Sequence, residues 1–170
     1  MVNIKPGDIF LLEGTGWLDR FINFFQALWN GDGKSNYTHS GIILDEYGTT
    51  FETTEWKTKC LNLFSDHPGS EVIIFRWKNM TQPAFAQGCL NVGDQLGKIY
   101  PYFRLLLFAT HIAKWFHWKK TVCSELVAKF LVGARARGSW WGINVDLLHD
   151  DCMAGDDWVL IYSGKPREMK

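Results

Sequence analysis

The chain has 170 residues, of which 46% are hydrophobic, and its 18 basic and 18 acidic side chains give a formal net charge of zero. This length and composition indicate a single globular domain over residues 1–170 and exclude a disordered chain. The balanced charge gives no electrostatic reason to expect a nucleic acid or an anionic membrane as a partner.

We expect neither a targeting segment nor a membrane-spanning segment from the sequence. The segment Met1–Asp8 has no basic stretch followed by an apolar core, so we expect no signal peptide, a cytoplasmic protein and reduced thiols. The longest apolar stretch of the second half, between Arg104 and Lys114, is much shorter than the roughly 20 residues that span a bilayer. The four cysteines form no CxxC pair, and we predict no metal site and no cofactor.

The first half of the chain is patterned mostly as strands. Short apolar or β-rich runs bounded by turn residues predict extended segments at Ile9–Leu12, Ser40–Leu44, Thr49–Thr54, Cys60–Leu63 and Val72–Arg76. Thr49–Thr54 is expected to pair back on Ser40–Leu44 as a hairpin. Apolar residues recur at helical spacing from Trp17 to Trp29, before the Gly-rich loop Asn30–Gly33.

The second half of the chain is patterned mostly as helices. Helical segments are expected at Pro83–Leu96, in part of Tyr102–Trp118 and at Cys123–Val132, with a short helical turn at Asp146–Asp150 and a last strand at Trp158–Tyr162. Strands that cluster apart from helices predict an α+β fold with a mostly antiparallel sheet.

Cys123 is the first candidate for chemistry. It begins the predicted helix directly after Lys119-Lys120 and Thr121-Val122. The exposed N–H groups and the positive end of a helix favour a thiolate over a thiol, and the thiolate is the nucleophilic form. A helix-start cysteine can equally be a small buried apolar residue, so the nucleophile needs a base.

His39 is the best candidate for that base among five histidines. It enters a predicted strand directly after the Gly-rich loop, and a rigid strand end is a suitable place to present an imidazole to a cleft. The alternative is a half-exposed strand residue without a role. His67 lies in a polar turn and is expected to be exposed, whereas His149 is expected to be a partner of neighbouring aspartates.

The third group is expected on the next strand. Glu52 lies on the strand predicted to pair with that of His39, where side chains of two antiparallel neighbours meet on one face. Glu55 is the competitor, although three residues further along a regular strand it falls on the other face. An ordinary solvated carboxylate is the alternative for both.

The combination of these segments resembles a known enzyme family. Thr38-His39-Ser40-Gly41-Ile42, Phe51-Glu52-Thr53, Gly97-Lys98-Ile99-Tyr100 and Val122-Cys123-Ser124-Glu125-Leu126-Val127 resemble the circularly permuted, NlpC-type papain-like cysteine hydrolases, from about Lys5 to Tyr162. In this order the histidine strand comes early and the nucleophile helix late. One departure is that the family often has Glu followed by Ala, whereas this chain has Glu52-Thr53.

The resemblance implies a fold and a set of roles. The fold would be a mostly antiparallel sheet or small barrel packed against a helical subdomain that carries the nucleophile helix. Cys123 would be the nucleophile, His39 the general base and Glu52 the orienting residue. Independently of the resemblance, the backbone N–H of Cys123 is the natural oxyanion donor because Cys123 begins a helix. The hydroxyl of Tyr37 is a second candidate, for which a packing ring is the alternative.

The resemblance also implies a reaction class. Relatives of this kind cut amide bonds in cell-wall peptides, and the lecithin–retinol acyltransferase relatives act on lipids. We therefore expect hydrolysis of an amide or peptide bond, with a lipid-directed thioesterase or acyltransferase as the alternative and a non-catalytic binding module as a third interpretation. The partner would be a peptide, amino-acyl or lipid acyl substrate. Without a signal peptide, a cytosolic or phage-encoded enzyme fits better than an exported one, and no oligomeric state is predicted.

Overall fold

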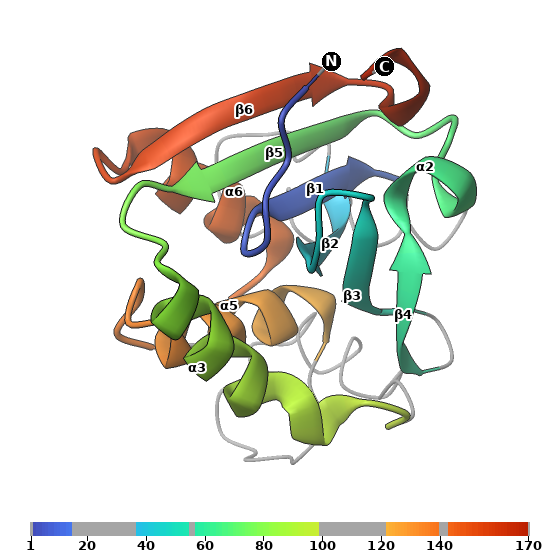
Figure 1. The fold of residues 1–170 in the computed structure, drawn as a ribbon. Coiled ribbons are helices and arrows are strands. Elements are labelled where there is room, and N and C mark those ends of the chain that lie inside the picture. Colours follow the sequence, from blue (N-terminus) through green and yellow to red (C-terminus); the bar gives the residue numbers. More distant parts are fainter. Residues whose placement is uncertain (1, 15–36, 55–56, 99–121, 140–142, 170) are drawn as a thin grey trace, which may run out of the picture.

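The computed structural model describes residues 2–14, 37–54, 57–98, 122–139 and 143–169. These residues form an α+β structure built on one antiparallel sheet, with strand order β4-β3-β2-β1-β5-β6 (Figure 1). The strands are β1 (Ile9–Glu13), β2 (Tyr37–Ile43), β3 (Thr49–Thr53), β4 (Thr58–Asn62), β5 (Val72–Trp77) and β6 (Trp158–Gly164). The helices are α2 (Leu63–Asp66), α3 (Gln82–Val92), α5 (Cys123–Gly133) and α6 (Val145–Ala154), with 3-10 turns η1 (Gly93–Gln95) and η3 (Pro166–Glu168). The predicted α+β class and antiparallel sheet are thus confirmed.

The central strand β1 is buried on both faces. Successive side chains of a strand point to opposite sides, so Ile9 and Leu11 enter one core and Phe10 and Leu12 the other. All four side chains are at most 3% exposed. A continuous apolar run of this kind is what a strand covered on both faces requires.

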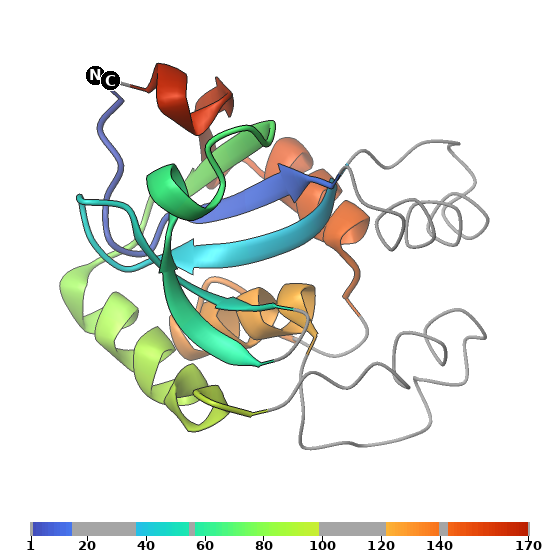
Figure 2. The same cartoon turned by 90° about the vertical axis from the view of Figure 1, so that its right-hand side faces the viewer.

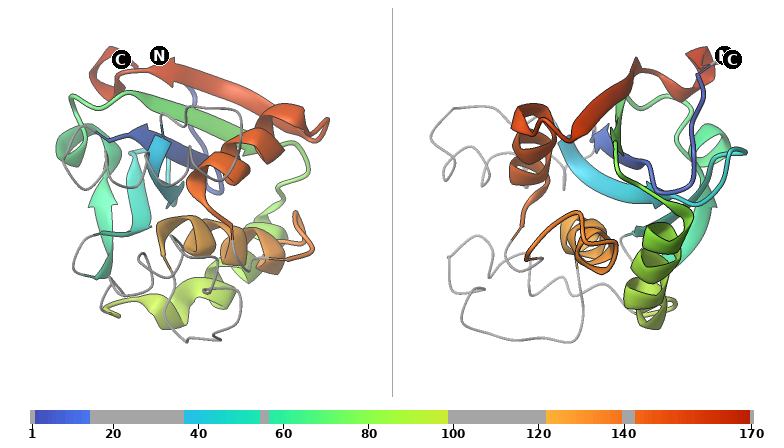
Figure 3. Two further views of the ribbon diagram at one scale, coloured as in Figure 1. Left: turned by 180° about the vertical axis from the view of Figure 1, so that it is seen from behind. Right: turned by 60° about the vertical axis from the view of Figure 1, so that its left-hand side comes forward.

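The first core lies between the sheet and the helices. Leu126, Val127 and Phe130 of α5 pack with Ile42 of β2 and Phe75 of β5. Helices α5 and α6 lie on the same side of the sheet, and α3 runs beside α5 (Figures 1 and 3). This packing buries most of α5, including its first residue, and therefore fixes the position of Cys123 against β2.

The second core lies on the opposite face, under α2, η3 and the two chain ends. Phe10, Ile74, Leu63 and Met169 are its buried members. The backbone N–H of Val2 donates to the carbonyl of Met169 at 3.0 Å, so the two ends of the described chain lie together (Figure 2). Burying apolar side chains on both faces leaves little freedom for the strands to slip in register.

The ladder between β2 and β3 is shorter than the strands themselves. Strand β2 pairs with β1 from Tyr37 to Ile42, but it pairs with β3 only through Gly41, Ile42 and Ile43. The first part of β2, which carries His39, therefore extends beyond the β3 ladder. This is the part of the sheet that the first residue of α5 approaches.

Several predicted boundaries differ from the structure. Strand β4 spans Thr58–Asn62 in place of the predicted Cys60–Leu63, and Leu63 begins helix α2. Strand β2 begins at Tyr37, before the predicted Ser40, because its first residues pair with β1. Helix α3 ends at Val92, before the predicted Leu96, and a tighter 3-10 turn follows at Gly93, a residue that disfavours helix.

Helix α6 is longer than the predicted helical turn. Asn144 caps it by accepting the N–H of Leu147, and Val145, Leu148 and Cys152 bury one face along ten residues. The helices expected at Trp17–Trp29 and within Tyr102–Trp118 lie outside the described residues. Among the residues that the structure describes, none of the helices has the length and apolarity needed to cross a bilayer.

Gly41 is predicted to be essential to the packing of the sheet. A Cβ atom at this position would lie 2.6 Å from the ring of Phe10 and 3.0 Å from the Cβ of Glu52. Because both neighbours are fully buried, Gly41→Ala should lower the free energy of unfolding by about 1–3 kcal/mol, measured by urea denaturation. Gly69→Ala is the matched control, since no atom lies within 4 Å of its added Cβ. Equal stability of the two variants would contradict this packing.

Candidate functional site

The start of helix α5 is held from two sides. The N–H of Val122, the N-cap residue, donates to the carboxylate of Glu125 at 3.3 Å. The hydroxyl of Ser124 donates to the carbonyl of Ile143 at 2.7 Å, which ties the helix start to the segment before α6. Cys123 lies between these two anchors and is 6% exposed. The sulfur therefore has a fixed position at the end of the helix where backbone N–H groups have no partner within the helix.

His39 links the start of α5 to the sheet. Its Nε2 lies 2.6 Å from Oε2 of Glu52, and the imidazole is close enough to the side chain of Cys123 for that side chain to raise its pKa. Since Nε2 is bound to Glu52, Nδ1 is the ring nitrogen left for the sulfur. The Cys123 sulfur also lies 3.9 Å from the carbonyl oxygen of Thr38. The predicted residues Cys123, His39 and Glu52 are thus brought together in one site.

The register of β2 and β3 explains why His39 and Glu52 meet. Glu52 is paired directly with Gly41, and His39 lies two residues before Gly41 on the same face of β2. Gly41 has no side chain, so the carboxylate can extend across it towards the imidazole. A longer side chain at position 41, directly opposite Glu52, would block the carboxylate from the imidazole.

Glu52 is a fully buried carboxylate with several donors. Its side chain has no solvent exposure, and the hydroxyl of Thr50 donates to Oε1 at 2.5 Å. Nε2 of His67 lies 3.1 Å from Oε2 and 3.3 Å from Oε1. The expectation that His67 is exposed is wrong: its side chain is only 18% exposed and faces the carboxylate. Burying a charge is costly unless it is paired and hydrogen-bonded, and this one is both.

The two partners shift each other's pKa. Burial lowers the pKa of His39, but hydrogen bonds to Cys123 and Glu52 and the negative charges of both outweigh it and raise the pKa to about 10. Burial raises the pKa of Glu52, but hydrogen bonds from His39 and His67 and their charges outweigh it and hold the pKa far below its ordinary value. His39 therefore carries a proton across the physiological range, opposite an ionised Glu52.

Tyr37 has a packing contact in the structure. Its ring stacks on His149 of α6, with centroids 5.2 Å apart and an interplanar angle of 26°. His149 also contacts Asp150 at 3.2 Å, as its acidic surroundings suggested. The role of Tyr37 as an oxyanion donor stays a prediction, as does that of the Cys123 N–H. Glu55, the competitor of Glu52, lies outside the described residues.

Three of the site's supporting residues were not identified from the sequence. Thr50 was detectable, because it lies two residues before Glu52 and so shares its face of the strand. Glu125 follows the N-cap by three residues, which is the acidic position of a capping box. His67 gave no local signal, because its contact depends on how α2 folds against the sheet.

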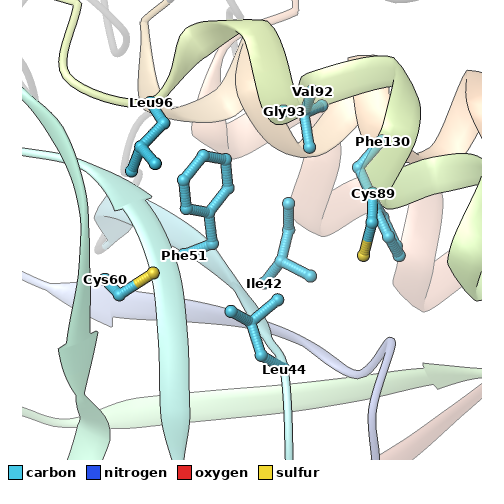
Figure 4. Close-up of a pocket in the computed structure, with 9 residues that line it drawn as sticks. All are labelled: Ile42, Leu44, Phe51, Cys60, Cys89, Val92, Gly93, Leu96 and Phe130. Atoms are coloured by element: carbon cyan, nitrogen blue, oxygen red, sulfur yellow. The ribbon is translucent and has the colours of Figure 1, made fainter.

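A separate apolar cavity of about 210 Å³ lies between the sheet and helices α3 and α5 (Figure 4). Ile42 and Phe51 from the sheet and Val92 and Phe130 from the helices line it, together with Leu44, Cys60, Cys89, Gly93 and Leu96. Burial raises the pKa of both lining thiols. This cavity has neither an acid–base pair nor an activated nucleophile and therefore does not compete with the Cys123 site.

Glu52→Gln should change how stability depends on pH. His39 has a pKa of about 10 in the folded protein against an ordinary 6.5, so its stabilisation is complete below pH 6.5 and is lost as the pH rises towards 10. Glu52, with its lowered pKa, stabilises above its ordinary 4.5 and loses this effect as the pH falls. We expect the free energy of unfolding of the wild type to fall from pH 6.5 to 10, by at most about 1.4 kcal/mol per pH unit for one proton.

In Glu52→Gln this alkaline decline should be shallower, and the protein should be about 3 kcal/mol less stable at pH 6, because a buried imidazolium has lost its partner. Urea denaturation at a series of pH values measures both effects. Glu46→Gln, at an exposed position of the β2–β3 turn, is the control and should match the wild type. Parallel wild-type and Glu52→Gln profiles would show that the pair does not carry the pH dependence.

Comparison with known proteins gives a likeness of fold. No protein-family model and no curated protein matches the sequence. Among solved structures, the chain is similar to the crystal structure of the metalloprotein yiiX from Escherichia coli O157:H7, described as DUF1105. The TM-score is 0.67 at 15% sequence identity, and the match covers 96% of this chain and 99% of the other. At this identity the match shows a shared fold over nearly the whole chain.

Proposed function

We propose that this chain is a cysteine hydrolase with a permuted papain-like fold, which cleaves an amide or peptide bond through an acyl-enzyme on Cys123. The observation that carries the proposal is that His39 contacts the buried Glu52 at 2.6 Å and lies beside Cys123, whose sulfur is 3.9 Å from the carbonyl oxygen of Thr38, the residue before His39. A nucleophile within reach of an imidazole, which a third group orients, is the recurring arrangement of nucleophilic catalysis.

The chain order supports the permuted arrangement. The histidine strand β2 and the carboxylate strand β3 come early, and helix α5 brings the cysteine 84 positions after His39. The helix meets β2 where that strand extends beyond the β3 ladder. This geometry agrees with the family resemblance of the sequence. The proposed reaction class is taken from that resemblance.

In the first half of the reaction, the Cys123 thiolate attacks the carbonyl carbon and forms a C–S bond. The carbonyl oxygen takes up the electron pair and becomes an oxyanion, which the N–H groups at the start of α5 stabilise. When the tetrahedral intermediate collapses, the C–N bond breaks and the leaving amine takes the proton held by His39. The product is a thioester between Cys123 and the acyl group.

In the second half, the now neutral His39 takes a proton from water as the water attacks the thioester carbonyl. Collapse breaks the C–S bond, releases the carboxylic acid and returns the thiolate beside protonated His39. Glu52 keeps the imidazole oriented and balances its charge in both halves. The raised pKa of His39 suits a group that starts the cycle protonated.

Metal chemistry enters no step of this proposal. The structurally similar Escherichia coli protein is described as a metalloprotein. In the parts of this chain with described coordinates, no group of three or more His, Cys, Asp or Glu residues is arranged to hold a metal ion. The strongest donor of the site, Glu52, already accepts from His39, His67 and Thr50. These residues therefore do not fit a metal in their present geometry.

Selective alkylation tests the nucleophile. Iodoacetamide at pH 6, followed by peptide mass spectrometry, should modify Cys123 at least about tenfold faster than the other three cysteines, because rates follow the thiolate fraction. Burial raises the pKa of the thiols of Cys60 and Cys89, and burial and Asp151 raise that of Cys152 to about 12. His39→Gln should remove the advantage of Cys123. Similar slow rates at all four cysteines would reject the catalytic proposal.

Hydrolysis assays separate the amide proposal from its alternatives. A panel of cell-wall peptides is compared with thioester and phospholipid substrates, with Cys123→Ala as the inactive reference. Cleavage of peptides that Cys123→Ala loses by more than about 10³-fold supports the proposed reaction, since the covalent step has no substitute nucleophile. Turnover only of the thioester or phospholipid would favour the lipid-directed alternative. Binding without turnover would favour a non-catalytic module.

A further inference from the structure

Two histidines share one buried carboxylate in this site. His39 contacts Oε2 of Glu52 from β2, while Nε2 of His67 lies 3.1 Å from Oε2 and 3.3 Å from Oε1. The two imidazole rings are 6.1 Å apart, and the ring of Phe10 lies 6.3 Å from each of them. The proposed reaction uses His39 and Glu52 but gives no role to His67.

The fold anchors His67 through several contacts of α2. The side chain of Asn62 caps this helix by accepting the N–H groups of Phe64 and Ser65, and it donates to the carbonyl of Tyr47 in the β2–β3 turn. The N–H of Leu63 donates to the carbonyl of Gly48 at 2.8 Å, and the ring of Phe64 packs directly over Gly48. His67, the C-cap residue of α2, is thereby delivered to the same hairpin that carries Glu52.

The direction of the hydrogen bonds follows from the acceptor. Both oxygens of an ionised carboxylate only accept, so Nε2 of His67 must carry a proton and donate it. Among the described residues, the ionisable groups facing this ring are Glu52 from β3 and His39 from β2; Phe10 from β1 supplies the apolar contact. The neighbouring Asp66 is engaged elsewhere, accepting the backbone N–H of Asn62.

Apart from His67, each oxygen of the Glu52 carboxylate has one donor. Thr50 binds only Oε1, and His39 binds only Oε2. Nε2 of His67 lies within hydrogen-bond distance of both oxygens and adds a third donor, which further restricts rotation about the bond to the carboxyl group. A side chain held by several partners keeps its geometry without paying the ordering cost during the reaction.

We propose that His67 is a positioning residue, which holds the Glu52 carboxylate in the orientation that binds and orients His39. The inference rests on the proposed function for its catalytic meaning, because it assigns His67 a role in orienting the base of that reaction. His67 acts through Glu52 and His39 and touches no reacting atom.

The test is the titration of the His39 ring followed by NMR in ¹⁵N-histidine-labelled full-length protein. His67→Ala and His67→Phe both remove the donor, and the Phe variant keeps a ring beside Phe10. Both should lower the His39 midpoint by about one pH unit or more, because a misoriented carboxylate stabilises the imidazolium less; one unit corresponds to a tenfold change in the protonation equilibrium. His67→Gln, whose amide places an N–H near the position of Nε2, should restore the midpoint towards the wild type.

Thr81→Ala is the stability control. Thr81 caps the remote helix α3 by accepting the N–H of Ala84, so its loss weakens the fold without touching Glu52. This variant should leave the His39 midpoint unchanged. An unchanged or higher midpoint in both donor-free His67 variants would overturn the proposal, as would a similar fall in Thr81→Ala. If His67→Ala fails to fold, the Phe and Gln variants decide alone.

The titration tests the role of His67 and the activity assays test the proposed function, so each can be rejected without the other. The His39 midpoint needs no substrate, so a lowered midpoint in a protein whose Cys123 is inert would reject the proposed function and leave the structural role of His67 intact. An active wild type in which neither donor-free variant moves the midpoint would reject the role of His67 and leave the hydrolase proposal intact.

Discussion

The buried carboxylate of Glu52 is the constraint on which the rest of the site depends. A charge with no solvent exposure has to be satisfied by protein donors, and here His39, His67 and Thr50 supply them. Thr50 lies on the same strand as Glu52, His39 lies on the neighbouring strand β2, and His67 lies at the end of helix α2. The burial of Glu52 therefore requires both the observed pairing of β2 with β3 and the observed packing of α2. A change in either arrangement would leave the buried charge without one of its donors.

The second requirement is that the start of helix α5 can approach His39, the partner of that carboxylate. The β2–β3 ladder stops at Gly41, so the first part of β2 carries His39 beyond it, towards the start of α5. Gly41 itself must lack a side chain, because Phe10 and Glu52 occupy the space where a Cβ would lie. A short ladder and one small residue thus allow a helix on one side of the sheet to share an imidazole with a carboxylate on the other.

The four cysteines show how environment divides one residue type into different chemistries. Burial raises the pKa of Cys60, Cys89 and Cys152, and at Cys152 burial and the charge of Asp151 outweigh the opposing charge of Arg137. Cys123 alone among them lies beside an imidazole that is itself paired with a carboxylate. The likeness to the Escherichia coli structure extends over the whole fold, at an identity too low to carry activity. The proposed hydrolase function therefore depends on the site geometry and on the sequence resemblance.

Sequence patterns were sufficient for the elements whose signals are local. Apolar runs located β1 and β5, a run of β-forming residues located β3, and helical spacing located α5, because these signals depend only on neighbouring residues. The same patterns led to Cys123, His39 and Glu52, since a helix start and two paired strands define where such side chains meet. The length of α6 also has local signals, which are the Asn144 cap and the spacing of its buried residues. The predicted helical turn was nevertheless shorter than the helix.

Only the tertiary structure decided which groups complete the site. His67 lies 15 residues after Glu52, and its sequence surroundings indicate an exposed turn; it reaches the carboxylate because α2 folds back on the β2–β3 turn. The pKa of His39 likewise depends on charges brought together from β3 and α5, which are distant in the chain. The sequence by itself determined the residue types and the local elements that carry them. Burial, register and long-range packing determined their partners and protonation, because those properties arise from contacts that no local pattern encodes.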